Sequence, residues 1–108
     1  MALFLMALVL SHGALAQPAL RIENFQTQLV SGPDSEGCVE FTLTATARNR
    51  GQFGKWFFVP VRALGGDGSP MLIVSLTGRI GGRQVGTLTG NGSMPFQAYQ
   101  SIATWEPF

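Results

Sequence analysis

The sequence has very few of the residues that most catalytic and metal-binding sites use. Among its 108 residues it has one cysteine, Cys38, and one histidine, His12. A single cysteine excludes a disulfide framework within the chain. Because His12 lies in an N-terminal segment that we expect to be removed, the mature chain would have no imidazole to act as a general base or to bind a metal ion.

Charge is also scarce, whereas apolar residues are abundant. Charged residues make up 12% of the sequence and hydrophobic residues 45%, which is too apolar for a disordered chain. The 14 glycines and 6 prolines disfavour a bundle of helices. No segment keeps helical periodicity over the roughly ten residues that a helix needs. The composition therefore predicts a small all-β domain.

The N-terminus has features of a secretory signal peptide. Residues 1–10 are all apolar, and Ala14-Leu15-Ala16 places small residues where signal peptidase would cleave, before Gln17. The usual basic start is missing, because the first basic residue is Arg21. An uncleaved anchor is the alternative, but the apolar run is much shorter than the roughly 20 residues of a spanning helix. We predict a signal peptide over residues 1–16, one domain over residues 17–108, export to the periplasm or extracellular space, and no membrane span after cleavage.

Two central segments have the clearest strand patterns. Residues 38–48 and residues 55–64 both alternate between two faces. A period of two is typical of strands with one face in the core. The predicted core residues are Val39, Phe41, Leu43, Ala45 and Ala47 in the first segment and Phe57, Val59, Val61 and Ala63 in the second. Pro60 cannot donate a hydrogen bond to a neighbouring strand, which predicts an edge or bulged position for the second segment.

Weaker patterns predict the other strands. Residues 20–30 change phase once, which predicts a bulged strand. Gly81-Gly82 predicts a two-residue hairpin turn with Ile80 opposite Arg83. That register would place Leu72, Val74, Leu76, Ile80 and Val85 on one core face. Asn91-Gly92 predicts a further turn, followed by a last strand over residues 94–105 that starts at Pro95.

The succession of elements resembles that of immunoglobulin-like exported modules. The resemblance covers architecture only and depends on the long alternating segment, the Asn-x-Gly corner at residues 49–51 and the aromatic-rich segment after it. It implies a small antiparallel immunoglobulin-like β-sandwich of six to seven strands. Such modules occur in adhesins, secretion accessory proteins and chaperones of curli-type amyloid subunits. A Cys-x-Cys pair found in some curli chaperones is absent around Cys38.

Aromatic and basic residues at the start of the second alternating segment form the candidate binding site. Trp56 and Phe58 fall on the face opposite the aliphatic residues, and Phe53 precedes them. Exposed aromatic residues among Arg and Lys are typical of binding hot spots. The candidate site consists of Phe53, Trp56, Phe58, Arg48, Lys55 and Arg62. In the alternative interpretation, the loop over residues 65–70 or the C-terminal Trp105 and Phe108 cover these aromatic residues as a second small core.

Catalysis, metal binding and cofactor binding have little support in the sequence. The only local group of acids is Asp34, Glu36 and Glu40, and the first two lie in a turn-forming loop where solvated acids are ordinary. We predict no catalytic residue, no metal site and no cofactor. Residues 41–83 hold six basic residues against Asp67, which could form a basic surface. Seven dispersed basic residues in all are too few to predict nucleic-acid binding.

The expected function is binding without catalysis. We expect an exported protein-binding module, such as a periplasmic chaperone or assembly accessory, that contacts a protein through a sheet edge or the aromatic and basic surface. The alternative is a structural subunit that polymerises through its edge strands or Cys38. Cys38 is expected to be buried or to form an intermolecular bridge. A curli-type chaperone in particular, or a small glycan-acting enzyme that uses the acids near Asp34, is a more remote alternative.

Overall fold

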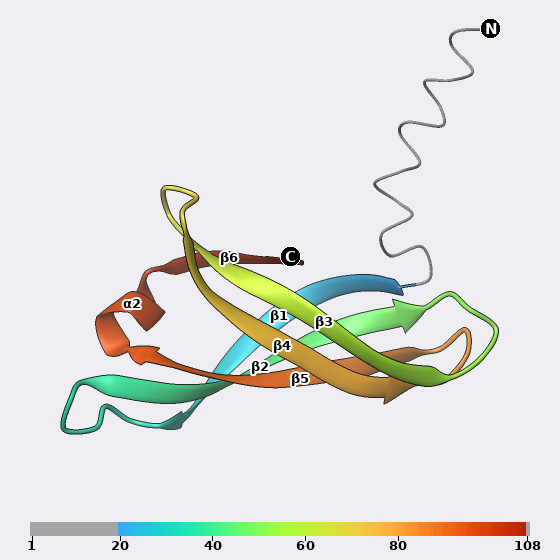
Figure 1. Cartoon of the computed structure of the whole chain (residues 1–108), viewed down its shortest axis with the longest axis horizontal. Coiled ribbons are helices and arrows are strands. Elements are labelled where there is room, and N and C mark those ends of the chain that lie inside the picture. Colours follow the sequence, from blue (N-terminus) through green and yellow to red (C-terminus); the bar gives the residue numbers. More distant parts are fainter. Residues whose placement is uncertain (1–19, 108) are drawn as a thin grey trace, which may run out of the picture.

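The computed structural model describes residues 20–107 and is all-β apart from one short helix (Figure 1). The strands are β1 (Leu20–Ser31), β2 (Cys38–Asn49), β3 (Lys55–Gly65), β4 (Pro70–Ile80), β5 (Val85–Pro95) and β6 (Ile102–Pro107). The helix α2 (Phe96–Gln100) connects β5 to β6. The predicted signal peptide and Phe108 lie outside the described residues.

All described strands belong to one antiparallel sheet in the order β1-β2-β5-β4-β3-β6. β2 and β5 pair along their whole length, from Cys38 opposite Pro95 to Arg48 opposite Val85. β4 and β5 pair only at Thr77 and Thr89. Figure 1 shows β3 and β4 crossing over β1, β2 and β5, and residues of both groups meet in one hydrophobic cluster. The sheet therefore curls at the short β4–β5 junction and encloses its own core.

The alternation in β2 and β3 correctly predicts the centre of this core. All nine predicted inward residues are buried, and none of those in β2 is more than 1% exposed. Val74, Leu76 and Ile80 of β4 are buried with them, as predicted. A side chain on every second strand position can face the same core because successive side chains point to opposite faces. The phase change in β1 is also confirmed as a bulge, with a register shift between Glu23 and Gln26 and a positive φ at Asn24.

Glycines at inward positions of β5 allow close packing of the strands on both sides. Phe41 of β2 lies opposite Gly92, and a Cβ atom at Gly90 would clash with the Ser75 carbonyl oxygen of β4. A Cβ atom at Gly92 would be 2.5 Å from Phe41 Cζ, so only glycine fits there without a shift of the ring. Because these inward positions of β5 lack side chains, the strand does not show the apolar alternation by which β2 and β3 were predicted.

The structure contains the predicted β4–β5 hairpin, but the prediction of its turn and of its register is wrong. The turn covers residues 81–84, where the Gln84 N–H donates to the Gly81 carbonyl at 3.2 Å and Arg83 has a φ of 58°. Val85 therefore does not join the core face; it lies opposite Arg48 and is 52% exposed. The long ladder with β2, and not the short contact with β4, decides which face of β5 points inward.

Two predictions near the C-terminus are also wrong. Asn91-Gly92 is not a turn, because β5 continues through it in register with β2. The predicted strand over residues 94–105 is interrupted by α2, which begins after Pro95. This short helix places Tyr99 against Phe41, with ring centroids 5.1 Å apart, and the Tyr99 hydroxyl 2.9 Å from Thr27 Oγ1. Tertiary packing therefore stabilises a helix too short to have a periodic signal.

Candidate functional site

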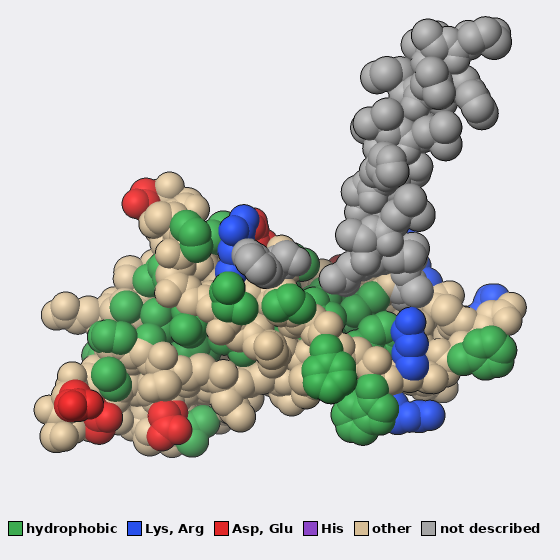
Figure 2. Space-filling model, in the orientation of Figure 1, with side chains coloured by type: hydrophobic (Ala, Val, Ile, Leu, Met, Phe, Trp, Pro, Cys, Tyr) green, Lys and Arg blue, Asp and Glu red, His purple; other side chains and the backbone are tan. Residues whose placement is uncertain are grey.

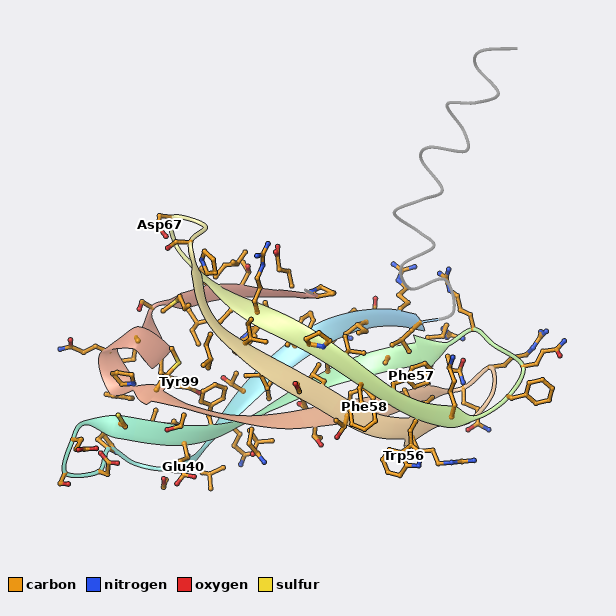
Figure 3. All side chains as sticks on the ribbon, viewed as in Figure 1. Glu40, Trp56, Phe57, Phe58, Asp67 and Tyr99 are labelled. Carbon is orange, nitrogen blue, oxygen red and sulfur yellow. The ribbon has the colours of Figure 1, made fainter. Side chains whose placement is uncertain are left out.

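The outer face of β3 presents two large aromatic side chains to solvent. Phe57 and Val59 point into the core, so the residues that alternate with them, Trp56 and Phe58, point outward. Trp56 is 63% exposed and Phe58 is 75% exposed. Figure 3 shows both side chains projecting from the same face of the ribbon, and Figure 2 shows hydrophobic atoms protruding at this place beside basic ones.

The neighbouring strand adds a basic residue that the sequence did not indicate. In the β3–β4 ladder Trp56 lies opposite Arg79, and Phe58 lies opposite Thr77. Cross-strand partners on one face have Cβ atoms about 5 Å apart, so the Arg79 guanidinium and the indole ring can contact the same ligand. We call Trp56, Phe58 and Arg79 the aromatic patch. Arg79 could be found only from the register of the β3–β4 hairpin, because it is more than twenty residues from Trp56 in sequence.

The structure does not gather the predicted basic residues around this patch. Lys55 is on the inward phase of β3 at the end of the strand, with its Nζ atom 5.2 Å from the centroid of the Phe57 ring. Arg62 shares the outer face but forms an ion pair with Glu106 of β6, with Arg62 Nη2 2.6 Å from Glu106 Oε2. Each of these cations is thus engaged within the fold.

Arg48, the third predicted basic residue, belongs to a different place on the surface. It lies on the outer face of β2 opposite Arg21 and Val85, and it lines a hollow that contains none of the aromatic candidates. The predicted site is therefore split between two regions.

Phe53, the third predicted aromatic residue, lies in the loop between β2 and β3 and is 79% exposed. Its carbonyl accepts a hydrogen bond of 2.9 Å from Asn49 Nδ2. Asn49 is fully buried and also donates to the carbonyls of Ile80 and Gly81, while its Oδ1 accepts from the Gly51 N–H. One amide side chain therefore holds the β2–β3 loop against the β4–β5 turn, and this end of β3 is well supported.

The alternative in which other segments cover the aromatic residues does not hold for the described residues. Trp105 packs inward, with its ring centroid 6.1 Å from that of Phe41. The loop over residues 65–70 follows the far end of β3 from Trp56. Phe108 lies outside the described residues. Both rings of the aromatic patch remain largely exposed.

Within residues 20–107, the backbone beside the patch has a partner strand on one side only and so forms part of an open sheet edge. β6 pairs with residues 61–65 of β3 and with none of residues 55–60. β3 lies between β4 and β6 in the strand order, so the edge position predicted from Pro60 is wrong for the strand as a whole, although residues 55–60 have no partner in β6. Unpaired backbone groups at an edge can pair with another extended chain.

One of the three acidic residues considered for catalysis, Asp34, has a structural role. Its Oδ1 accepts hydrogen bonds from the N–H groups of Cys38 at 2.9 Å and of Glu36 at 2.8 Å. These bonds stabilise the charged form and lower the pKa of Asp34. Such a carboxylate stays ionised near neutral pH and holds the β1–β2 loop, which makes it a poor proton donor. Cys38, at the end of that loop, is half-buried.

Within residues 20–107 no cluster of three or more His, Cys, Asp or Glu residues could hold a metal ion. In the same part of the chain, no helix has the length and apolar character to cross a membrane. No protein-family model, no curated protein and no solved structure matches the chain.

Proposed function

We propose that this chain is an exported, non-catalytic protein-binding module whose partner packs on the aromatic patch. The observation that supports the proposal most is the exposure of Trp56 and Phe58, 63% and 75%, side by side on one strand. Trp and Arg are among the residue types enriched at binding hot spots. Two large aromatic side chains that are neighbours on an outward face form an apolar patch outside the core, which favours a binding role.

The fold that we propose for the module is an immunoglobulin-like β-sandwich. In this proposal β1, β2 and β5 form one layer and β4, β3 and β6 the other. The single residue pair between β4 and β5 supports a division at this point. The neighbour relations β1-β2-β5 and β4-β3-β6 also match strands A-B-E and C′-C-F of immunoglobulin domains.

The open edge indicates what kind of partner segment the patch would take. An extended chain that paired with residues 55–60 of β3 would place alternate side chains beside Trp56 and Phe58. Backbone pairing would supply affinity with little sequence specificity, and the aromatic rings would select apolar side chains. A chaperone or assembly accessory that receives an extended apolar segment of another exported protein fits this chemistry.

Site-specific photocrosslinking tests the proposal. The chain is expressed in its native host with p-benzoylphenylalanine in place of Phe58, and irradiated cells are analysed for covalent adducts. We expect a discrete adduct with one exported protein, and we expect Trp56→Ala in the same chain to reduce its yield at least about tenfold, as for a hot-spot residue.

The matched control places the same photoreactive residue at Val30. Val30 is exposed to a similar degree, 65%, but lies on β1. Absence of an adduct from position 58, or the same set of adducts from both positions, would contradict the proposal.

A polymerising structural subunit remains the second candidate, because β1 and β6 are both edge strands of the sheet. Sedimentation velocity of the mature chain, with and without a reductant, separates the two functions. Oligomers that grow with concentration would favour the subunit, and their loss on reduction would assign the contact to Cys38. A monomer under both conditions would eliminate it.

Export has its own test. We expect N-terminal sequencing of the protein recovered outside the cytoplasm to begin at Gln17. A chain that retains residues 1–16 and stays in the cytoplasm would contradict this part of the proposal.

A further inference from the structure

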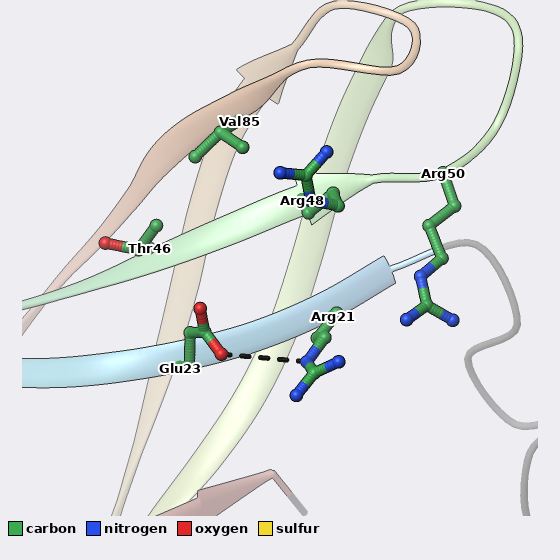
Figure 4. Close-up of a pocket in the computed structure, with 6 residues that line it drawn as sticks. All are labelled: Arg21, Glu23, Thr46, Arg48, Arg50 and Val85. Atoms are coloured by element: carbon green, nitrogen blue, oxygen red, sulfur yellow. Dashed lines mark ion pairs between the residues drawn. The ribbon is translucent and has the colours of Figure 1, made fainter.

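A second surface feature lies on β1 and β2, away from the strands that carry the aromatic patch. Arg21, Glu23, Thr46, Arg48, Arg50 and Val85 line a hollow of about 350 Å³, which we call the arginine hollow (Figure 4). Its residues come from the first part of β1, the last part of β2, the loop after β2 and the first residue of β5. The register places them together although they span most of the described chain.

Positive charge in the arginine hollow is only partly compensated. Glu23 is the single acid in the lining, and its Oε1 lies 3.6 Å from Arg21 Nε. Both side chains are more than half exposed, so this ion pair is weak. Neither Arg48 nor Arg50 forms an ion pair with any residue in the described part of the chain. The hollow therefore has an excess of two positive charges.

The strand register brings two of these cations directly together. Arg21 and Arg48 are cross-strand partners on the outer face of the sheet. Like charges at such positions destabilise a sheet. The next outward pair along this ladder, Glu23 and Thr46, has no such repulsion. A neutral polar residue at either position would avoid this repulsion, so the fold itself gives no reason for two arginines here.

We propose that the arginine hollow binds a phosphate group. A phosphate monoester carries close to two negative charges at neutral pH, which matches the excess of two positive charges. The planar guanidinium groups of Arg48 and Arg50 can each donate two parallel hydrogen bonds to phosphate oxygens. The Thr46 hydroxyl, which also lines the hollow, can donate a further hydrogen bond. A single carboxylate would neutralise only half of the excess charge.

Nuclear magnetic resonance titration with inorganic phosphate tests this proposal. Ionic strength is held constant with sodium chloride, so that general screening does not change. We expect saturable shifts of the amide signals of residues 21–23, 46–50 and 85. Arg48→Gln and Arg50→Gln should each weaken binding at least tenfold.

The matched control is Arg79→Gln, which removes the same charge from an outward position on β4 outside the hollow. Its phosphate affinity should equal that of the unsubstituted chain. Shifts that spread over all arginine-bearing strands, or equal losses from Arg79→Gln and Arg48→Gln, would overturn the proposal.

The phosphate could belong to a soluble molecule or to a lipid headgroup. A sedimentation assay with lipid vesicles distinguishes these two sources. Vesicles of phosphatidylcholine with and without phosphatidic acid, whose headgroup is a phosphate monoester, are sedimented with the mature chain. Co-sedimentation that needs phosphatidic acid and is lost in Arg48→Gln would assign a headgroup. Saturable phosphate binding without co-sedimentation would assign a soluble ligand, and failure of both assays would overturn the proposal.

Discussion

β2 and β3 both place hydrophobic residues on their inward faces, but they differ in the residues on their outward faces. Every predicted inward residue of both strands is buried. The outward residues at the centre of β2 are Thr42, Thr44 and Thr46, whereas the outward residues of β3 include Trp56 and Phe58. Threonine is both polar and well suited to a strand, so the outer face of β2 is what folding and solubility alone would favour. The aromatic residues of β3 also suit a strand, but they expose apolar surface that solubility disfavours.

The difference between these strands distinguishes residues that stabilise the fold from residues that are available for binding. Inward residues determine stability, because their removal leaves a cavity in a closed core. Outward residues are free to vary unless a partner contacts them. The inward faces of β2 and β3 therefore determine stability, and the outward face of β3 is the proposed binding surface.

The largest expected effect is at the inward face of β2. Phe41 is fully buried and contacts the rings of Tyr99 and Trp105. We expect Phe41→Ala to lower the free energy of unfolding by about 3–5 kcal/mol, because it removes a large side chain that neighbouring groups cannot replace. Urea denaturation measures this change. On the outward face of the same strand, Thr44→Ala should change the free energy of unfolding by no more than about 0.5 kcal/mol. Equal losses from Phe41→Ala and Thr44→Ala would contradict the difference between the two faces of β2.

The buried amide that supports the start of β3 should have the next largest effect. Asn49→Ala deprives the carbonyls of Phe53, Ile80 and Gly81 of their donor. Since unpaired buried polar groups are costly, we expect a loss of roughly 2–3 kcal/mol. Hydrogen exchange should then show faster opening of residues 50–54 and 81–84. Asn91→Ala, at an exposed position on β5, serves as the control, and a similar loss there would refute the special role of Asn49.

A methyl group on the inward face of β5 should cost less. In Gly92→Ala the new Cβ would approach Phe41 Cζ to 2.5 Å, so the ring must move. We expect a loss of roughly 1–2 kcal/mol from overpacking. Thermal unfolding of this variant and of Gly32→Ala, which adds a methyl group in open space, measures the difference. A Gly92→Ala protein as stable as the control would show that the β2–β5 contact is loose.

The smallest of these effects is pH dependence at the β1–β2 loop. Hydrogen bonds from the N–H groups of Cys38 and Glu36 lower the pKa of Asp34 below its ordinary value of 3.8. A lowered pKa in the folded state means that the stabilisation is complete above this ordinary value and is lost as pH falls through the folded pKa. Asp34→Ala should therefore be less stable than the unsubstituted chain at pH 5–7, and the difference should shrink as pH falls below about 4.

Acid titration of unfolding, followed by circular dichroism, measures this convergence. Glu36→Ala removes the same charge from the same loop without removing an acceptor of loop hydrogen bonds. Parallel curves for Asp34→Ala and the unsubstituted chain across the acid range would contradict the role assigned to Asp34.

The sequence predicted those strands in which hydrophobic residues occupy the buried positions and polar residues the exposed ones. Hydrophobic and polar residues alternate from Val39 to Ala47 and from Phe57 to Ala63. They do so because one face of each strand contacts the core and the other face is turned away from it. The bulge in β1 was visible as a change of phase, whereas Pro60 predicted an edge strand and β3 is an inner strand whose residues 55–60 alone lack a partner in β6. The all-β class followed from composition and from these strands together.

The elements that could not be predicted depend on partners distant in sequence. β5 has glycine at the inward positions 90 and 92, so its buried Leu88 and Met94 are too far apart to show an alternating pattern, and its register comes from the ladder with β2. Val85 was placed on the core face because its strand was aligned with β4 instead. Of the candidate site, Trp56 and Phe58 were predictable from alternation, whereas Arg79 and the meeting of Arg21 with Arg48 required the strand register.

The free energy of unfolding of the double variant Trp56→Thr/Phe58→Thr tests the central claim most directly. The substitution gives β3 the kind of outward face that β2 has. If these aromatic rings serve a partner and not the core, urea denaturation should give a stability within about 0.5 kcal/mol of the unsubstituted chain. A loss of 2 kcal/mol or more, on the order of a large-to-small core substitution, would contradict the account.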